Sequence, residues 1–214
     1  VNPKAELTFA SALRSILRQD PDIIMIGEIR DGETASIAIQ ASITGHLVVS
    51  TLHTNDTAAS VTRLMDMGVE SYLIADSTVG IIAQRLVRRL CPNCRVKRPM
   101  LDYEEAYLEL TPEEKKKHTH LYEAGSCPRC NGTGYHGRIG VYEIMEITPN
   151  LRGYIARKAD TDTLREAAVK EGMLTLKQSS RRLVLEGVTT VQEMQRISAQ
   201  DADLSGVDAL AAEE

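Results

Sequence analysis

The chain has 214 residues, of which 43% are hydrophobic, and it carries a formal net charge of -5 at pH 7. A chain of that length can bury one large hydrophobic core and a second small one. Proteins that bind nucleic acids in general are usually basic and stack bases on aromatic side chains, so the acidic net charge, the single Phe and the absence of Trp argue against that class. No run approaches the ~20 apolar residues that span a bilayer, and the N-terminus lacks the basic-then-apolar order of a signal peptide, so we expect a cytosolic protein.

The first third of the chain alternates between helix and strand. Helices are predicted where apolar side chains recur at helical spacing behind a capping residue, and strands where short β-branched runs end in polar residues. In chain order these elements are a helix from Thr8 to Pro21, a strand at 23–26, a helix from Asp31 to Gly45, a strand at 47–52, and a helix from Asn55 or Asp56 to Gly68. The apolar residues of the second helix that we expect to face the sheet are Ala35, Ile37, Ala38, Ala41 and Ile43. The alternation is typical of a doubly wound α/β sheet with two buried parallel strands.

The stretch from Tyr72 to Leu90 changes character at Gly80. Its first half is helix-like, and a strand is expected from Ile81 to Leu86. The arginines near its end are Arg85, Arg88 and Arg89. We interpret them as a solvated basic face, since surface arginines are ordinary, with a phosphate contact as the less favoured alternative.

Four cysteines form two Cys-x-x-Cys pairs, Cys91 with Cys94 and Cys127 with Cys130. Two such pairs are a strong zinc signature, because each short turn directs two thiolates at one tetrahedral ion. The pairs also suit a reducing compartment better than two disulfides would. A shell of four cysteines leaves no open position, so we interpret the site as structural. A redox dithiol and an iron–sulfur cluster are the less favoured alternatives.

The segment between the two cysteine pairs contains a helix signal and is followed by a strand-like run. Thr111 and Glu114 have the spacing of a capping box, with Pro112 at the first helical position, which predicts a short polar helix. The apolar run from Gly137 to Ile144 then predicts a strand. The zinc module, residues 91–136, is therefore expected to be inserted between two parts of a larger domain.

From Pro149 the sequence predicts short amphipathic helices. Gly172 and Gly187 end the first two, and capping boxes begin all three. The boxes pair Thr163 with Glu166, Thr175 with Gln178 and Thr190 with Glu193. These helices either cap the larger domain or offer a contact surface to neighbouring subunits and partners, and the sequence favours neither. The tail from Asp201 to Glu214 is acidic and rich in small residues, which predicts disorder.

Ionisable side chains follow both predicted parallel strands. Glu28 and Arg30 come directly after the first strand, while His46 and His53 flank the second. Because the carboxyl ends of parallel strands meet at one edge of a sheet, this pattern indicates a phosphate or nucleotide site. The plainer alternatives are core strands with polar loops, and a strand-end salt bridge between Glu28 and Arg30. His53 ranks above His46, because Thr51 and its neighbours supply further polar groups around His53.

Three contiguous motifs in this region resemble those of the type II secretion and type IV pilus assembly ATPases, the GspE/PulE/PilB family. They are Leu-Arg-Gln-Asp-Pro-Asp at 17–22, Gly-Glu-Ile-Arg-Asp at 27–31 and Ser-Thr-Leu-His-Thr-Asn at 50–55. The resemblance extends from Val1 to about Ser198. It implies an α/β fold with part of a RecA-like P-loop NTPase core, an inserted tetracysteine zinc module and a C-terminal helical subdomain.

The resemblance also implies roles for individual residues. Catalysis is expected from Glu28 in the Walker B region and His53 in the histidine box, with His46, Thr51 and Arg30 contacting the nucleotide. Arg14 and Arg18 are alternatives to Arg30 for the phosphate contact, and the sequence does not choose among the three. The implied cofactors are ATP, Mg²⁺ and Zn²⁺. The implied partners are the other subunits of a homo-hexamer and inner-membrane platform proteins of a secretion or pilus machine, with no direct binding of nucleic acid. The expected location is the cytoplasm, peripheral to the inner face of the bacterial membrane.

No GxxxxGK(S/T) phosphate loop occurs in the 214 residues. The resemblance places that loop, with an acidic box, upstream of Val1, so we expect a C-terminal piece of the ATPase that binds ATP weakly or not at all alone. The expected segments are 1–90 for the ATPase core, 91–136 for the zinc module, 137–148 for a returning strand, 149–200 for the helical subdomain and 201–214 for the disordered tail. The alternative from a different class is a non-catalytic zinc-ribbon adaptor that binds protein or nucleic acid.

Overall fold

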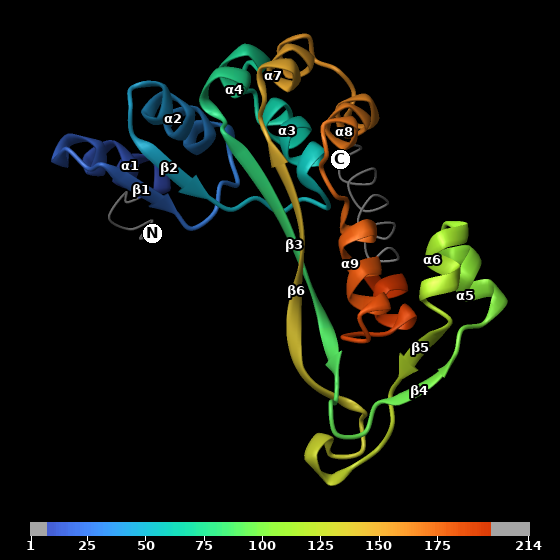
Figure 1. The fold of residues 1–214 in the computed structure, drawn as a ribbon. Coiled ribbons are helices and arrows are strands. Elements are labelled where there is room, and N and C mark those ends of the chain that lie inside the picture. Colours follow the sequence, from blue (N-terminus) through green and yellow to red (C-terminus); the bar gives the residue numbers. More distant parts are fainter. Residues whose placement is uncertain (1–7, 198–214) are drawn as a thin grey trace, which may run out of the picture. The chain divides into compact units, whose positions relative to one another are not determined.

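The computed structural model describes residues 8–197 (Figure 1). By their internal contacts these residues form two compact units, each with its own core. Unit 1 comprises 8–82 and 144–173, and unit 2 comprises 83–143 and 174–197. The predicted disorder of 201–214 concerns residues outside the described range. The boundaries of these two units differ from the boundaries of the five segments expected from the sequence. Those five segments stay a prediction.

Unit 1 combines a small parallel sheet with helices. In chain order its elements are α1 at Phe9–Ile16, the 3₁₀ helix η2 at Leu17–Gln19, β1 at Ile23–Ile26, α2 at Gly32–Ile43, β2 at Leu47–Ser50, α3 at Thr57–Asp66, α4 at Ser71–Ser77, α7 at Pro149–Ala156 and α8 at Thr161–Lys170. The predicted order of helix and strand up to Gly68 is confirmed. The α-helical part of the first helix ends at Ile16, earlier than predicted, and β2 ends at Ser50 rather than at 52.

The sheet of unit 1 consists of β1 and β2, which pair in parallel over their whole length. Ile24 and Ile26 lie in the core formed with the helices and are 3% and 5% exposed. On the opposite face Ile23 and Met25 are 64% and 76% exposed. The predicted parallel pairing is confirmed. The prediction that both strands are buried is wrong, because within residues 8–197 helices cover only one face of this sheet.

Side-chain caps begin most helices where the sequence predicts them. The caps that are confirmed are Thr8, Asp31, Asp56, Thr111 and Thr175. The predicted Thr163 cap is wrong. Asp160 caps α8 instead, and its carboxylate accepts the Thr163 N–H at 2.9 Å. Asp160 has the extended backbone of a cap residue, which places Thr163 inside the first turn.

Glycines end four helices as predicted, each in the left-handed region of backbone space. They are Gly45, Gly68, Gly172 and Gly187. Within α2 the prediction that Ile43 faces the sheet is wrong, because its side chain is 48% exposed. Ala35, Ala38 and Ala41 repeat every third residue on the buried face. Ile43 is rotated by roughly 200° from Ala41 around the helix axis.

A second pair of strands forms the long ribbon seen in Figure 1. It consists of β3 at Gly80–Leu90 and β6 at Tyr135–Glu146. The predicted strands at 81–86 and 137–144 are confirmed and extend further at both ends. The boundary between the two units falls within both strands, between residues 82 and 83 of β3 and between residues 143 and 144 of β6. In unit 1 the pairing continues one step beyond the strands, because the N–H of Ile147, just after β6, donates to the carbonyl of Val79, just before β3, at 3.1 Å.

Unit 2 brings the segment between the cysteines together with the last helices. Its remaining elements are β4 at Val96–Pro99, α5 at Asp102–Tyr107, α6 at Pro112–Lys117, β5 at His120–Glu123, the 3₁₀ helix η3 at Pro128–Cys130, α9 at Leu176–Leu185 and a helix at 191–197. Leu108 and Leu121 share a core cluster with Val184, Val191 and Met194. The predicted zinc module and the final helices therefore have a common core. Among the helices of the described residues, none has both the length and the apolar composition that a bilayer span requires.

We predict that Leu121→Ala destabilises unit 2 as a whole. Leu121 is 1% exposed, and truncation of a buried leucine costs about 2–5 kcal/mol. Because Leu121 shares its core with α9 and the helix at 191–197, amide hydrogen exchange should accelerate in those helices as well as between the cysteine pairs. Amides of α2 and α3 in unit 1 should keep their protection.

Leu174→Ala is the matched control, since Leu174 is 53% exposed. It should change the free energy of unfolding by less than about 0.5 kcal/mol. Faster exchange in Leu121→Ala that is confined to residues 91–136 would contradict the shared core.

Candidate functional site

The first candidate site lies beyond the carboxyl ends of β1 and β2. Because the strands are parallel, the residues that follow them emerge at the same edge of the sheet. Glu28 follows β1 and His53 follows β2, and the His53 Nε2 lies 3.0 Å from the Glu28 Oε2. Arg30 pairs with the other carboxylate oxygen of Glu28, Oε1, at 2.6 Å. The structure thus brings three of the predicted site residues together, while their roles stay a prediction.

Two hydrogen bonds join the segments that carry these side chains. The Ile29 N–H donates to the Thr51 carbonyl at 3.1 Å, and the Thr51 hydroxyl donates to the Gly27 carbonyl. Thr51, which is predicted to contact a nucleotide, therefore uses its O–H to hold the two strand ends together. These bonds continue the association of the strands past their ends and fix the backbone spacing between Glu28 and His53.

The carboxylate of Glu28 is ionised at neutral pH. Hydrogen bonds from Arg30 and then from His53 lower its pKa below the ordinary value of 4.5. An ionised carboxylate can only accept hydrogen bonds, so the His53 Nε2 carries the hydrogen in this contact. The side chains of Arg30 and His53 are 71% and 83% exposed, against 25% for Glu28. Exposed pairs of this kind are weak, so a ligand can replace either partner.

His46, also predicted as a site residue, lies at the end of α2. Its Nδ1 is 3.0 Å from the Ala41 carbonyl and 3.3 Å from the Thr44 Oγ1. The Ala41 carbonyl is one of those that a helix leaves without an intrahelical partner at its C-terminus, and it also accepts the His46 backbone N–H at 3.1 Å and the Thr44 hydroxyl at 3.0 Å. His46 is therefore held by its own helix, and its contact with a nucleotide stays a prediction.

The loop that carries His53 is anchored by Asp56 and Arg165, neither of which was expected to be a site residue. The Asp56 Oδ1 accepts the Ala59 N–H at 2.8 Å and so caps α3. The Asp56 Oδ2 accepts a hydrogen bond from the Arg165 Nη2, on α8, at 2.6 Å. The cap is predictable from the local sequence. No local signal points from Arg165 to a partner 109 residues away.

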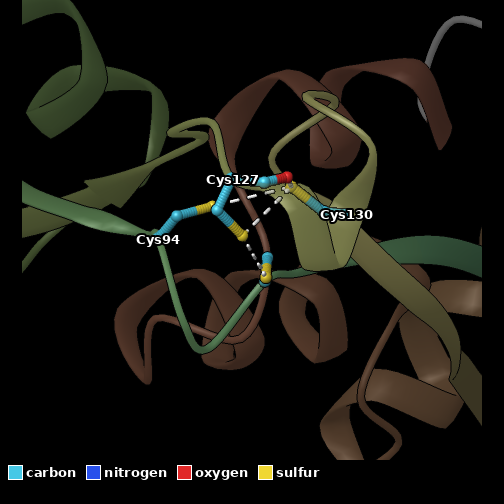
Figure 2. A group of neighbouring side chains, drawn as sticks. Cys94, Cys127 and Cys130 are labelled. Carbon is cyan, nitrogen blue, oxygen red and sulfur yellow. Dashed lines mark hydrogen bonds between the residues drawn. The ribbon is translucent and has the colours of Figure 1, made fainter.

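The second candidate site is the group of four cysteines in unit 2 (Figure 2). Their sulfurs lie within 4.8 Å of one another. The separations are 3.8 Å for Cys91–Cys127, 3.7 Å for Cys94–Cys130 and 3.7 Å for Cys127–Cys130. Thiolates bound ~2.3 Å from a tetrahedral Zn²⁺ stand about 3.8 Å apart. Figure 2 shows the sulfurs of three labelled cysteines turned toward one another. The cysteines meet as predicted, at a spacing compatible with zinc.

Two glycines allow close backbone contacts around the cysteines. A Cβ on Gly125 would collide with the backbone carbonyl of Cys94, and a Cβ on Gly134, which has a φ of 73°, would collide with Ala124 and the Gly125 carbonyl. The backbone also reaches the sulfurs, since the Gly134 N–H donates to the Cys130 Sγ at 3.2 Å. The Cys91 N–H in turn donates to the Gly134 carbonyl at 2.8 Å. An N–H donor to sulfur favours the thiolate, which is the form that binds metals.

The thiols of this cluster differ in how readily they ionise. A hydrogen bond from the Asn93 side chain is the largest cause that lowers the pKa of Cys127, to about 6. Burial, followed by hydrogen bonding to the neighbouring thiols, raises the pKa of Cys94 to about 12. Ionising a second thiol beside a thiolate is unfavourable because like charges repel. Four thiolates at this spacing therefore need a cation among them.

Comparisons with known proteins cover nearly the whole chain. The family model described as type II/IV secretion system protein matches residues 1–196. The type II secretion system protein HxcR of Pseudomonas aeruginosa is 49% identical over 198 residues, which cover 92% of this chain and 38% of HxcR. The type IV pilus assembly ATPase PilB of Acinetobacter baylyi is 49% identical over 203 residues, which cover 94% of this chain and 34% of PilB.

A solved structure supports the fold. The crystal structure of the pilus retraction motor PilT with bound ADP matches with a TM-score of 0.62 and 26% sequence identity, and the match covers 89% of this chain and 43% of that one. The chain spans between about a third and two-fifths of the length of the two curated relatives. Both candidate sites lie inside the range that the family model matches.

We predict that Arg30→Gln raises the pKa of Glu28 toward 4.5, because the hydrogen bond from Arg30 is the largest cause of its lowering. The pKa should stay somewhat below 4.5, since His53 still donates. An NMR titration of the Glu28 carboxyl carbon measures it. The contacts also make the free energy of unfolding depend on pH. Because the pKa of Glu28 is lower in the folded state than its ordinary value, the stability that these contacts contribute is present above the ordinary pKa and is lost as the pH falls through the folded-state pKa.

Arg14→Gln is the control for that titration. Arg14 pairs with Glu33 at 2.8 Å, so its loss should leave the Glu28 titration as in the wild type. A Glu28 pKa in Arg30→Gln equal to the wild-type value would show that Arg30 does not hold the carboxylate.

Proposed function

The chain belongs to the family of type II/IV secretion system proteins, and on that basis we propose that it is the C-terminal part of an ATPase that drives assembly of a pilus or of a secretion pseudopilus. Its relatives include a type II secretion protein and a pilus assembly ATPase. Because the chain corresponds to only 38% and 34% of those two proteins, the activity of the whole protein is part of the proposal.

The contact between Glu28 and His53 carries this proposal. It places an ionised carboxylate and an imidazole N–H at the carboxyl ends of two parallel strands, which is where open α/β sheets bind nucleotides. Phosphoryl transfer depends on positioning and charge stabilisation more than on covalent chemistry. A carboxylate and a hydrogen-bond donor that are held by neighbouring strands are suited to both tasks.

The low pKa of Glu28 supports an orienting role over proton abstraction, since a carboxylate of depressed pKa is a weak base. We infer that Glu28 orients the attacking water or accepts hydrogen bonds from the Mg²⁺ shell, and that His53 donates to a phosphate oxygen. Carboxylate oxygens are ligands that suit Mg²⁺. When bound, ATP and Mg²⁺ would supply the phosphoryl group and neutralise its charge. Arg30, exposed and weakly paired, is available to contact phosphate, as are Thr51 and His46 in the proposal.

We propose that unit 1 is part of a RecA-like core. The parallel pairing of β1 and β2 around α2 supports it, and so does the likeness to the PilT structure. Parallel sheets are normally covered on both faces. The exposed apolar face formed by Ile23, Met25, Leu47 and Val49 is therefore suited to packing against the remainder of that core in the whole protein.

We further propose that the four cysteines hold one structural Zn²⁺. The separations of the sulfurs near 3.7–3.8 Å support a tetrahedral ion. Four cysteine ligands leave no position for a substrate, so the metal would stabilise unit 2 and take no part in hydrolysis. The matched family range includes the cysteines, which favours a zinc module within the ATPase over a separate zinc-ribbon adaptor.

The proposed assembly is a homo-hexamer that works on the inner face of the bacterial membrane through platform proteins. The names of the relatives support this class of machine.

We predict that Glu28→Gln, introduced into the whole protein, lowers ATP turnover by about 10²–10³-fold, because the neutral amide loses the negative charge and one of the two acceptor oxygens that would orient the water and the Mg²⁺ shell. ATP binding should stay nearly intact. Steady-state hydrolysis and equilibrium binding of nucleotide measure the two effects. Glu33→Gln is the matched control, since Glu33 is an exposed carboxylate of α2 that pairs with Arg14. Near-normal turnover in Glu28→Gln would refute the role of Glu28.

We predict one zinc per chain by elemental analysis of gently purified protein. Gly125→Ala should lose the metal, because its Cβ would displace the Cys94 carbonyl. Chelation should unfold unit 2, including α9, and leave unit 1 folded, since the binding free energy of a structural zinc is folding free energy for the part that it holds.

Gly153→Ala is the control for that substitution, because the atom nearest to its added Cβ is 4.0 Å away. It should keep the zinc. Metal-free protein with four titratable thiols and a folded unit 2 would argue against a structural metal.

A further inference from the structure

The loop from Thr51 to Asp56, which carries His53, is held at both ends within unit 1. At its near end, Thr51 bonds to the backbone that follows β1, through the Gly27 carbonyl and the Ile29 N–H. At its far end, Asp56 accepts a hydrogen bond from Arg165 on α8. His53 lies between these two attachments. Its position relative to Glu28 therefore depends on both of them.

The far attachment is strong for a contact near the surface. Arg165 donates through Nη2 to Asp56 and through Nη1 to Asp162, both at 2.6 Å. The side chains of Arg165 and Asp56 are 33% and 19% exposed, whereas Asp162 is 83% exposed. A charge-assisted hydrogen bond that is partly shielded from water is worth more than an exposed ion pair. The Asp56 contact is thus the one that anchors the arginine.

The helix that carries Arg165 is itself fixed. Leu164 and Ala168 of α8 are each 2% exposed and belong to the core cluster that contains Val61 of α3. A hydrogen bond of 2.8 Å joins the hydroxyls of Thr62 and Thr161 beside them. Because α8 packs on α3 in this way, Arg165 approaches Asp56 from a rigid element.

Hydrogen bonds through Ser60 of α3 connect Asp56 to Thr54, the residue that follows His53. The Ser60 hydroxyl donates to the Asp56 carbonyl at 3.1 Å, and the Thr54 Oγ1 lies 2.7 Å from the Ser60 Oγ. A displacement of Asp56 would therefore be passed to Thr54 and to His53, which precedes it. No comparable set of bonds ties His53 itself to α3 in the described residues, where its partner is Glu28.

We propose that Arg165 is a positioning residue for the candidate catalytic pair. By holding Asp56, it fixes the loop that presents the His53 Nε2 to Glu28, so that α8 sets the geometry of a site to which it contributes no reacting group. The consequence for hydrolysis rests on the proposed function. The effect on the contact between His53 and Glu28 is a property of this chain and can be measured without ATP.

The first test is the NMR signal of the His53 side chain in the 214-residue chain, with the ring nitrogens labelled. Glu28→Gln gives the reference position for His53 without its carboxylate. In Arg165→Gln the His53 signal should move at least halfway toward that reference, while the signal of His46, which is held by α2, should not move. A His53 signal that stays at its wild-type position would overturn the proposal.

Asp162→Asn is the matched control. It weakens the other contact of the same arginine without touching the loop, so the His53 signal should not move. An equal shift in Asp162→Asn and Arg165→Gln would assign the effect to a general loosening of α8 and overturn the proposal. If Arg165→Gln does not fold, Arg165→Lys is used in its place. Lysine keeps the positive charge but lacks the planar guanidinium that donates to Asp56 and Asp162 at the same time. The His53 signal should then lie between the wild-type and reference positions, and a wild-type position would refute the proposal.

The second test is ATP hydrolysis by the whole protein. Arg165→Gln should lower kcat about tenfold or more, because small misplacements of reacting groups are costly, and should change the KM for ATP less than about twofold, since no binding group is removed. If Glu28→Gln abolishes hydrolysis while Arg165→Gln alters neither kcat nor the His53 signal, the positioning role of Arg165 is refuted and the proposed function stands. If Arg165→Gln shifts the His53 signal but Glu28→Gln leaves hydrolysis intact, the proposed function fails and the positioning role of Arg165 stands.

Discussion

The parallel pairing of β1 with β2 is the constraint on which the first candidate site depends. The register places Ile26 opposite Ser50 at the ends of the strands. Glu28 and His53 follow within a few residues, and the bonds of Thr51 to the other strand end keep the segments together past the ladder. A slip of one residue would turn the core side chains of β1 to the exposed face. The apolar side chains that bury one face of the sheet therefore also fix the distance between Glu28 and His53.

Unit 2 depends on a different constraint, because the segment between the cysteine pairs is largely polar. Ion pairs that are buried or partly buried hold some of its charged side chains. Glu104 is 0% exposed and accepts two hydrogen bonds from Arg98, while Glu114 accepts one from Arg181 of α9. Arg98 also lowers the pKa of Glu104, which keeps that buried carboxylate ionised. Breaking a buried pair of this kind is costly. A metal that closes the 36-residue separation between Cys91 and Cys127 would add to these contacts.

Local signals were enough to predict most of the helices and strands and part of the candidate site. Caps, glycine stops and the two cysteine turns depend on neighbours a few residues away, so they are visible in the sequence. The meeting of Glu28 with His53 follows from parallel strands alone. Burial is not local, which is why the exposure of Met25 and Ile43 was predicted wrongly. The contact between Asp56 and Arg165 was missed for the same reason, because nothing near either residue identifies the other.

The charged side chains around Glu28 indicate how binding of an anionic ligand would change the hydrogen bonds and the pKa of Glu28. Arg30 and His53 are both exposed donors, and a polyphosphate competes with the carboxylate for each of them. If Arg30 turns to a phosphate, Glu28 loses the largest cause of its low pKa, and that pKa rises toward 4.5. The carboxylate would still be ionised at neutral pH, but one of its oxygens would be free to accept a hydrogen bond from water. Under the proposed function, the salt bridge expected as the plainer alternative and the catalytic role would therefore be two states of the same side chain.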